Sequence, residues 1–206
     1  MTGIINYGAG NIYSVFTAVK TCGGEPFVIE KATDLKKGSM IVLPGVGAFA
    51  DGIKSLSESG IIEPLIREIE KGKPFLGICL GLQLLFSYSE EGNCRGFDLI
   101  KGDVKKFSFG NRDFRIPHMG WNKLKIIDRK NWLFDDIPDN EYFYFAHSYY
   151  PEPEDCSVIL GKTLYGIEFV SAIKKQNLVG VQFHPEKSAD CGIRFLKNFM
   201  GGKWLR

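Results

Sequence analysis

The first half of the chain alternates short, almost continuously apolar runs with segments of helical periodicity. The runs are rich in β-branched and large apolar residues and end at glycine, proline or asparagine, which is typical of strands. They cover residues 3–6, 26–29, 40–43 and 75–78. Strands that are apolar on both faces and separated by helices are typical of a parallel sheet that is buried on both sides. The pattern therefore predicts an α/β fold.

Helices are expected between these strands and near the end of the chain. Apolar residues recur at helical spacing over residues 12–22, 61–69 and 189–199. Elsewhere in the second half, strands are expected to follow one another through turns, at residues 104–107, 124–127, 142–145, 158–160, 167–173 and 178–183. We expect one flavodoxin-like, three-layer α/β domain over residues 1–206, with a central mixed, mostly parallel sheet.

Composition excludes several classes of protein. The 26 Lys and Arg residues nearly balance the 24 Asp and Glu residues, which argues against nucleic acid as the main partner. The sequence contains no signal peptide and no apolar run of membrane-spanning length. An odd number of scattered cysteines, without a CxxC pair and with only three histidines, indicates a reducing compartment and no metal site. We expect a cytoplasmic protein without a bound cofactor.

The strongest local signal is Gly77-Ile78-Cys79-Leu80-Gly81, which follows an expected strand. This is the cysteine version of the nucleophile elbow, in which flanking glycines relieve crowding where a strand turns sharply into a helix. We expect that helix to continue through residues 84–86. Cys79 would lie at its N-terminus, where the dipole and the free amides stabilise a thiolate. The N–H of Leu80 would donate to an oxyanion that forms beside the sulfur.

A nucleophilic cysteine needs a base, and three histidines are candidates. His184 directly follows an apolar strand, which is a usual position for a catalytic residue in an open α/β sheet. Glu186 lies two positions later, across Pro185, so its carboxylate could orient the imidazole. His118 and His147 remain alternatives, since either could equally be a core histidine bonded to backbone. His184 is favoured, with Cys79, His184 and Glu186 as the triad.

Motifs along the whole chain resemble those of the class I glutamine amidotransferases, which use a Cys-His-Glu triad. The resemblance to this family rests on Pro44-Gly45-Val46-Gly47, Gly77-Ile78-Cys79-Leu80-Gly81 and His184-Pro185-Glu186. Four further segments resemble the glutaminase subunits of imidazole glycerol phosphate synthase: residues 6–11, 117–122, 144–149 and 184–188. Each motif is modest alone, but their agreement in order is highly specific.

The resemblance implies roles for particular residues. Cys79 would attack the side-chain amide of L-glutamine, with His184 and Glu186 as base and orienter. Further residues are assigned by their match to the family: an oxyanion loop at Gly45, Val46 and Gly47 acting with Leu80; glutamine binding by Gln83, Glu91, Ser148 and Tyr149; and a partner interface at Asn11, Tyr144 and Lys187. Trp121 and the aromatic run at residues 142–145 are either core or part of that docking surface.

The resemblance also implies a partner and leaves alternatives. Ammonia would pass to a (β/α)8-barrel synthase subunit, in a heterodimer that makes imidazole glycerol phosphate and AICAR in histidine biosynthesis. Asn6 and Ala9 depart from the family pattern, which usually has Asp and Met there, and related subunits supply ammonia for amination of surface-polysaccharide sugars. A cysteine peptidase or esterase on a similar fold and a non-catalytic binding module are the alternatives from other classes.

Overall fold

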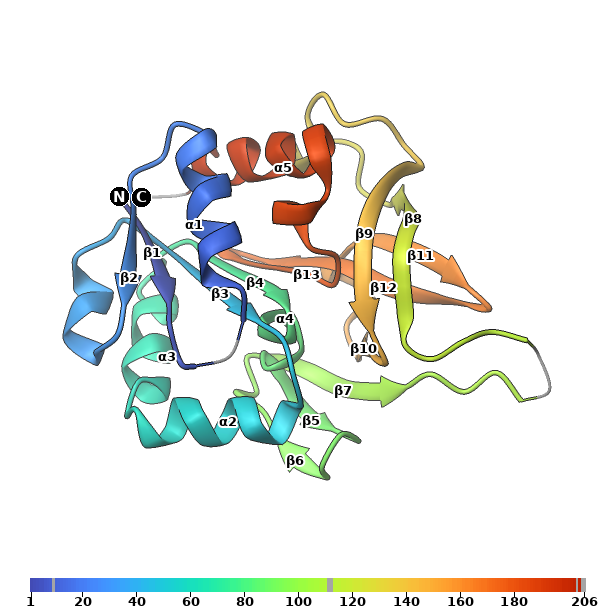
Figure 1. Ribbon diagram of the computed structural model, residues 1–206, viewed down its shortest axis with the longest axis horizontal. Helices are drawn as coiled ribbons and strands as arrows, with labels where there is room; N and C mark the ends of the chain where they lie inside the picture. Colours follow the sequence, from blue (N-terminus) through green and yellow to red (C-terminus); the bar gives the residue numbers. More distant parts are fainter. Residues whose placement is uncertain (9, 111–112, 203, 205–206) are drawn as a thin grey trace.

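A nine-stranded sheet forms the centre of the computed structural model, which describes residues 1–206 except 9, 111, 112, 203, 205 and 206 (Figure 1). Five strands at one end of the sheet are parallel. In spatial order they are β2 (Pro26–Ile29), β1 (Thr2–Ile5), β3 (Met40–Gly45), β4 (Phe75–Cys79) and β13 (Leu178–Val181). The antiparallel remainder is β12 (Ile167–Lys175), β11 (Ile159–Tyr165), β8 (His118–Ile126) and β9 (Glu141–His147).

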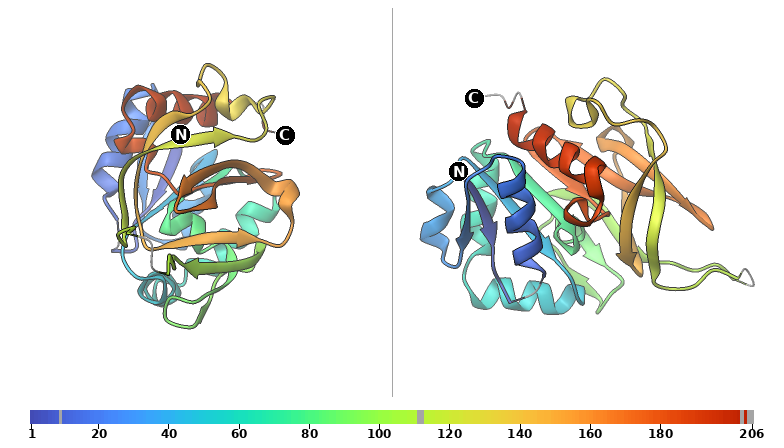
Figure 2. Two further views of the ribbon diagram at one scale, coloured as in Figure 1. Left: turned by 90° about the vertical axis from the view of Figure 1, so that its right-hand side faces the viewer. Right: turned by 45° about the horizontal axis from the view of Figure 1, so that its top comes forward.

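Helices cover both faces of the parallel strands (Figures 1 and 2). One face carries α1 (Ile12–Thr21) and α5 (Ala189–Gly201), and the other carries α2 (Phe49–Glu58) and α3 (Ile62–Glu70). Alternate strand residues serve the two cores: Ile4 belongs to the cluster with α1 and α5, whereas Ile5 belongs to the cluster with α2 and α3. The predicted three-layer α/β architecture is therefore confirmed.

A second sheet of four strands, in the order β10-β7-β5-β6, accompanies the first. Its strands are β5 (Phe86–Ser89), β6 (Cys94–Arg95), β7 (Ile100–Lys106) and β10 (Tyr149–Pro153). Only β7 overlaps a predicted strand, and helix α2 was also not predicted. Short 3-10 turns complete the fold: η1 (Ala32–Lys36), η2 (Trp132–Phe134), η3 (Cys156–Val158) and η4 (Pro185–Lys187).

The helix expected after Cys79 is much shorter than predicted. Helix α4 covers only Leu80–Gln83, and strand β5 begins at Phe86. The chain leaves the helix because later residues capture its carbonyl groups: Phe97 N–H donates to the Leu84 oxygen at 2.8 Å, and Ile100 N–H to the Leu85 oxygen at 3.0 Å. The prediction that the helix continues through residues 84–86 is therefore wrong.

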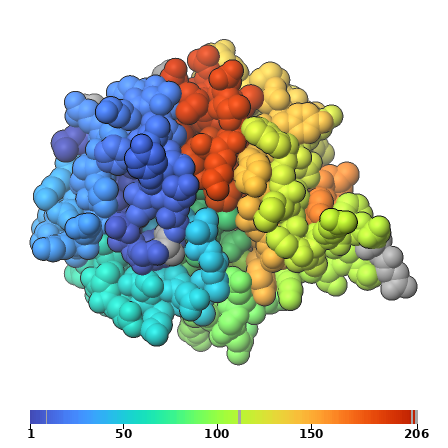
Figure 3. All heavy atoms as spheres, viewed as in Figure 1, coloured from blue at the N-terminus to red at the C-terminus, as the bar shows by residue number. Residues whose placement is uncertain are grey.

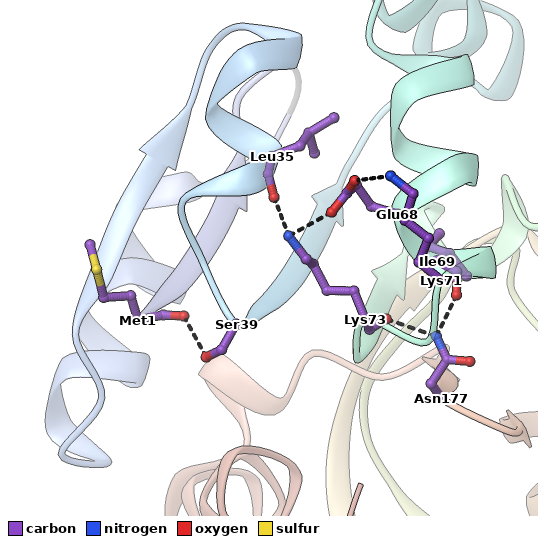
Figure 4. Close-up of polar contacts among 8 residues, drawn as sticks. All are labelled: Met1, Leu35, Ser39, Glu68, Ile69, Lys71, Lys73 and Asn177. Carbon is purple, nitrogen blue, oxygen red and sulfur yellow. Dashed lines mark hydrogen bonds and ion pairs between the residues drawn. The ribbon is translucent and has the colours of Figure 1, made fainter. Parts of the chain in front are cut away.

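The edge of the sheet where the parallel strands begin is closed by polar contacts (Figure 4). The Asn177 side-chain amide donates to the carbonyl oxygens of Ile69 and Lys73, at 2.8 Å each, and thereby joins the β12–β13 turn to the α3–β4 connection. Lys73 also contacts the carboxylate of Glu68 at 2.8 Å. At the other side of the molecule, the connection from β7 to β8 projects from the body (Figures 1 and 3).

No helix within the described residues is long and apolar enough to cross a membrane.

Candidate active site

Cys79 ends strand β4 in a conformation that few residues adopt. Its backbone has φ +53° and ψ −108°, so the chain turns sharply as the strand enters α4. The flanking glycines are sterically required. A Cβ atom on Gly77 would lie 2.5 Å from the carbonyl oxygen of Gly81, and one on Gly81 would collide with the carbonyl oxygen of Leu43. The strand-to-turn geometry therefore matches the elbow expected from the sequence.

The one-turn length of α4 changes the electrostatics expected at Cys79. A helix macrodipole accumulates over several aligned turns, so a single turn supplies only a small dipole. Leu80 begins this turn, and the first N–H groups of a helix have no intrahelical acceptor. Stabilisation of a negative charge beside Cys79 must therefore come from individual donors and from neighbouring charged groups.

His184 supplies such a charge. Its side chain is buried, and Nδ1 lies 2.8 Å from Oε1 of the equally buried Glu186. Pro185 opens the turn η4 between them, which brings the carboxylate back to the imidazole. Burial alone would lower the pKa of His184, but the charge of Cys79 and hydrogen bonds with Cys79 and Glu186 raise this pKa to about 10. The arrangement favours an imidazolium beside the sulfur of Cys79.

His118 and His147 form a separate buried pair. His147 Nδ1 donates to the Tyr149 carbonyl oxygen at 2.8 Å, which leaves its Nε2 to accept from His118 Nδ1 at 3.0 Å. His118 Nε2 then accepts from the Asn122 amide at 3.2 Å. Burial lowers the pKa of His118 to about 4 and that of His147 to about 3, so both stay neutral near pH 7. Of the three histidines, His184 is the one held by a carboxylate.

The expected oxyanion loop lies next to the nucleophile. Gly45 ends β3 and pairs in register with Cys79 across the parallel β3–β4 ladder. Val46 and Gly47 follow and line the same pocket as Cys79 and Leu80. Gly47 has φ +103°, a backbone conformation that side chains other than glycine rarely adopt. The structure therefore brings all four oxyanion candidates to the elbow.

The residues expected to bind glutamine line this pocket, which has a volume of about 180 Å³. They are Gln83, Glu91, Ser148 and Tyr149. Gln83 uses both amide hydrogens within the protein, donating to the Tyr149 carbonyl oxygen at 2.9 Å and to Gln182 Oε1 at 3.0 Å. A ligand hydrogen bond to Gln83 can therefore only be accepted by its Oε1. Glu91 Oε2 accepts from the N–H of Phe49 at 2.8 Å and so caps α2.

The expected interface residues lie at or near the surface. The Asn11 side chain caps α1 by accepting from Ser14 N–H at 3.1 Å. Tyr144 fixes the backbone of His184, because the Tyr144 carbonyl oxygen accepts a hydrogen bond from the His184 N–H at 2.8 Å. The Lys187 ammonium lies 5.8 Å from the centre of the Tyr144 ring. These positions are compatible with an interface beside the triad.

The aromatic residues of β8 and β9 divide between core and surface. Trp121 pairs with Tyr144 across the two strands, and its side chain is 52% exposed. Tyr142 is exposed on the same face, whereas Phe143 and Phe145 are fully buried on the other. Met119, at 65% exposure, continues the outer face towards the pocket. We call Met119, Trp121, Tyr142 and Tyr144 the outer β8–β9 face.

Sequence reasoning missed several residues at the site. Gln182 is fully buried, and its amide lies 3.5 Å from Cys79 Sγ. No local pattern marked it, because β13 ends at Val181 and Gln182 and His184 follow in irregular chain, where strand periodicity does not apply. Tyr7 places its hydroxyl beside Gly45, and burial together with the charge of Cys79 raises its pKa. Ala9, of the same segment, lies outside the described residues, and Asn6 accepts from Gly8 N–H at 3.1 Å.

Comparison with known proteins gives three further findings. Residues 4–201 match the family described as glutamine amidotransferase class-I. The chain is 46% identical over 206 residues to "Imidazole glycerol phosphate synthase subunit HisH" of Desulfitobacterium hafniense (strain DSM 10664 / DCB-2), covering 100% of this chain and 95% of the relative. The subunit of the same name from Aquifex aeolicus (strain VF5) is 45% identical over 200 residues, covering 96% of this chain and 95% of that protein.

Solved structures show a similar fold at low sequence identity. "Structure of PurLQS from Thermotoga maritima" includes a chain that matches with a TM-score of 0.76 and 18% identity, covering 97% of each chain. The structure described as "Trypanosoma brucei CTPS - glutaminase domain with bound acivicin" matches with a TM-score of 0.67 and 15% identity, covering 99% of this chain and 95% of that one. These likenesses concern the arrangement of strands and helices.

Proposed function

We propose, from the premise that this chain belongs to the class I glutamine amidotransferases and within them to the HisH subunits of imidazole glycerol phosphate synthase, that it hydrolyses L-glutamine and delivers the ammonia to a synthase subunit. The observation that carries this proposal is the strained Cys79 at the end of β4, beside a buried His184–Glu186 pair. A peptidase, an esterase or a non-catalytic module has no comparable support from the relatives.

The reaction has two halves. The Cys79 thiolate attacks the side-chain carbonyl carbon of glutamine, and the imidazolium of His184 gives its proton to the departing nitrogen, so that ammonia and a glutamyl thioester form. His184, now neutral, takes a proton from water as the water attacks the thioester. The carbon–sulfur bond breaks, its electron pair returns to Sγ, and glutamate leaves. Glu186 keeps Nδ1 protonated and orients the ring.

Substrate binding is assigned to the pocket over the elbow. Backbone N–H groups of the 45–47 loop and of Leu80 stabilise the oxyanion, which requires close approach of the backbone to the substrate. The carboxylate of Glu91 and the Oε1 of Gln83 accept hydrogen bonds from the α-amino group of glutamine. Ser148 and Tyr149 also line this pocket.

The ammonia acceptor is a second chain. We assign it to a (β/α)8-barrel synthase subunit that makes imidazole glycerol phosphate and AICAR for histidine biosynthesis in the cytoplasm. The outer β8–β9 face supports such a partner, because exposed Trp, Tyr and Met side chains are enriched at protein interfaces. Asn11, Tyr144 and Lys187 are the residues that link the interface to the triad.

The decisive experiment compares glutamine turnover by the wild-type chain and two variants, with and without the synthase subunit. Cys79→Ala should abolish glutamate formation, because the nucleophile is lost. Glu186→Gln should lower kcat by roughly 10²–10⁴-fold, since the imidazole loses the carboxylate that orients it and stabilises its charge. Turnover that persists in Cys79→Ala would refute the assignment of the nucleophile.

The acceptor is tested separately. Wild-type protein mixed with the imidazole glycerol phosphate synthase subunit and its nucleotide substrate should form imidazole glycerol phosphate from glutamine. No product in that mixture, with an aminated sugar formed when a sugar-aminating synthase subunit and its sugar substrate are supplied instead, would indicate the polysaccharide alternative. The chain alone should turn over glutamine slowly, because we expect the N–H groups of the oxyanion loop to reach their catalytic position only when the partner is bound. High turnover without a partner would contradict the proposed coupling.

A further inference from the structure

Gln182 is a polar side chain in contact with the nucleophile that the reaction described above does not use. It is fully buried, and its Nε2 lies 3.5 Å from Cys79 Sγ, although the two residues are 103 positions apart in the sequence. The backbone of Gln182 is held as well, since its N–H donates to the Ser171 carbonyl oxygen at 2.9 Å. Both the side chain and the backbone of Gln182 are therefore held in place beside the sulfur.

The neighbours of Gln182 determine which end of its amide faces the sulfur. The Tyr149 carbonyl oxygen can only accept, so Gln83 must present its NH₂ group to it, at 2.9 Å. The second hydrogen of that NH₂ group then points to Gln182, which must offer its oxygen, at 3.0 Å. The NH₂ group of Gln182 is consequently directed at Cys79. His147 holds the same Tyr149 carbonyl from another side, at 2.8 Å.

We propose that Gln182 is a further catalytic residue, whose amide donates a hydrogen bond to the Cys79 thiolate and is held in that orientation by Gln83. The inference rests on the proposed role of Cys79 as the nucleophile. A thiolate can only accept hydrogen bonds, whereas the thiol can donate, as the 3.8 Å contact from Sγ to the Ala146 carbonyl oxygen allows. A fixed donor on the sulfur therefore favours the ionised form.

The same hydrogen bond assists both halves of the reaction. It keeps the sulfur ionised before attack, and it stabilises the returning electron pair when the carbon–sulfur bond of the thioester intermediate breaks. Gln182 is not part of the pocket lining, whereas Gln83 is. Changes at Gln182 should therefore affect kcat much more than the KM for glutamine.

Other ionisable groups also act on Cys79 and must be separated from Gln182. His184 faces the sulfur from the end of β13, with Glu186 behind it on η4. Tyr7 acts from the β1–α1 connection, and His147 and Glu91 lie at the wall of the pocket. None of these groups is changed when Gln182 is replaced by an uncharged side chain of similar length.

The test is the pH dependence of Cys79 alkylation by iodoacetamide, measured on the full chain by mass spectrometry of the Cys79 peptide, with and without the synthase subunit. Gln182→Met keeps the length of the side chain and removes the donor. In this variant we expect the rate of Cys79 alkylation at pH values below the midpoint of its pH dependence to fall by roughly 10-fold. The midpoint itself should move to higher pH by about one unit. Gln182→Glu should move it further in the same direction, because its carboxylate repels the thiolate.

Ser171→Ala is the matched control. Ser171 is also fully buried and shares a hydrogen bond with Thr163 at 2.9 Å, but the side chain does not contact Cys79. Its alkylation profile should equal that of the wild type, and kcat should be unchanged. Near-UV circular dichroism of all variants checks that the folds match.

Two outcomes would overturn the inference. One is a wild-type alkylation profile and kcat in folded Gln182→Met, and the other is an equal shift in Ser171→Ala. If Cys79→Ala is inactive while Gln182→Met is unchanged, only the role of Gln182 fails. If Cys79→Ala still turns over glutamine, the proposed nucleophile itself fails, whatever the Gln182 variants do.

Discussion

Two glycines flanking Cys79 allow the sharp turn that exposes the sulfur to the pocket. At Gly81, a methyl group would collide with the carbonyl oxygen of Leu43, which belongs to the rigid β3 strand. Backbone cannot move aside as a flexible side chain can, so the elbow itself would have to shift. The sharp turn at Cys79 is therefore possible only because Gly77 and Gly81 have no side chains.

We predict that Gly81→Ala lowers the free energy of unfolding by about 1–3 kcal/mol and abolishes most glutaminase activity. Urea denaturation and steady-state turnover measure the two effects. The control is Gly201→Ala at the end of α5, where the described residues place no atom within 4 Å of the added Cβ, apart from the chain neighbours and the backbone of α5 itself. That variant should be as stable as the wild type or up to about 1 kcal/mol more stable. Equal behaviour of the two variants would contradict the steric argument.

The lowered pKa values of His118 and His147 lead us to predict that the folded protein loses stability in acid. Their pKa values in the folded protein, about 4 and about 3, lie below the ordinary value of 6.5. The unfolded chain therefore binds more protons than the folded chain as the pH falls below 6.5, and the free energy of unfolding decreases. His184 has the opposite shift, so its stabilising contribution is lost on the alkaline side, between 6.5 and about 10.

Urea denaturation at pH 7 and pH 5 tests this expectation. Each buried neutral histidine contributes a slope of at most about 1.4 kcal/mol per pH unit in this range. Because glutamine does not titrate, His118→Gln should reduce the slope of the unfolding free energy against pH on the acid side. The reduction should be at most about 1.4 kcal/mol per pH unit, which corresponds to one proton. An unchanged slope in this variant would show that His118 is not held neutral in the folded state.

At the scale of elements, the α3–β4 connection illustrates how burial decides the value of an ion pair. Glu68 contacts both Lys71, at 3.0 Å, and Lys73, at 2.8 Å (Figure 4). The side chain of Lys71 is 66% exposed, whereas that of Lys73 is 14% exposed. Lys73 also donates to the Leu35 carbonyl oxygen, which ties α3 and β4 to η1.

Replacing each lysine by methionine should separate the two contacts. Lys73→Met should cost about 1–2 kcal/mol of unfolding free energy, because the Leu35 carbonyl loses its donor and a largely buried ion pair is broken. Lys71→Met should change stability by less than about 0.5 kcal/mol, since exposed ion pairs contribute little. The midpoint of urea unfolding measures both, and equal losses would refute the distinction.

At the scale of the whole molecule, the outer β8–β9 face lies next to the pocket that contains Cys79. Met119 belongs to both, and Trp121 follows it on the same face. At the other end of the sheet, β2 carries Val28, which is 36% exposed. Under the proposed function, we expect the partner that receives ammonia from this pocket to approach the β8–β9 side.

Trp121→Ala should therefore weaken binding of the synthase subunit by roughly 30-fold or more, the effect of removing an aromatic anchor of about 2 kcal/mol. Calorimetric titration of the two subunits gives the affinity. Val28→Ala, at the far edge of the sheet, is the control and should bind as the wild type does. An unaffected affinity in Trp121→Ala would place the interface elsewhere.

Much of the fold was predictable because it depends on local patterns. The almost continuous apolar runs identified the parallel strands, and the helical spacing of apolar residues identified helices α1, α3 and α5. Helix α2 was missed because its sequence contains Gly52 and two serines, and a distant carboxylate, Glu91, caps its N-terminus. The extended helix after Cys79 was predicted wrongly, because carbonyl capture by residues 97–100 is a long-range event.

The sequence by itself determined the chemistry that the chain can carry. The glycines of the elbow flank Cys79 within one short motif, and His184 and Glu186 are separated by one proline, so both groupings can be read from a short stretch of sequence. Tertiary structure alone decided that Gln182 faces Cys79. It also decided that His118 and His147 form a hydrogen bond with each other in the core. These contacts join residues brought together by strand pairing and by core packing. Their orientation follows from which donors and acceptors meet there, which no short sequence window contains.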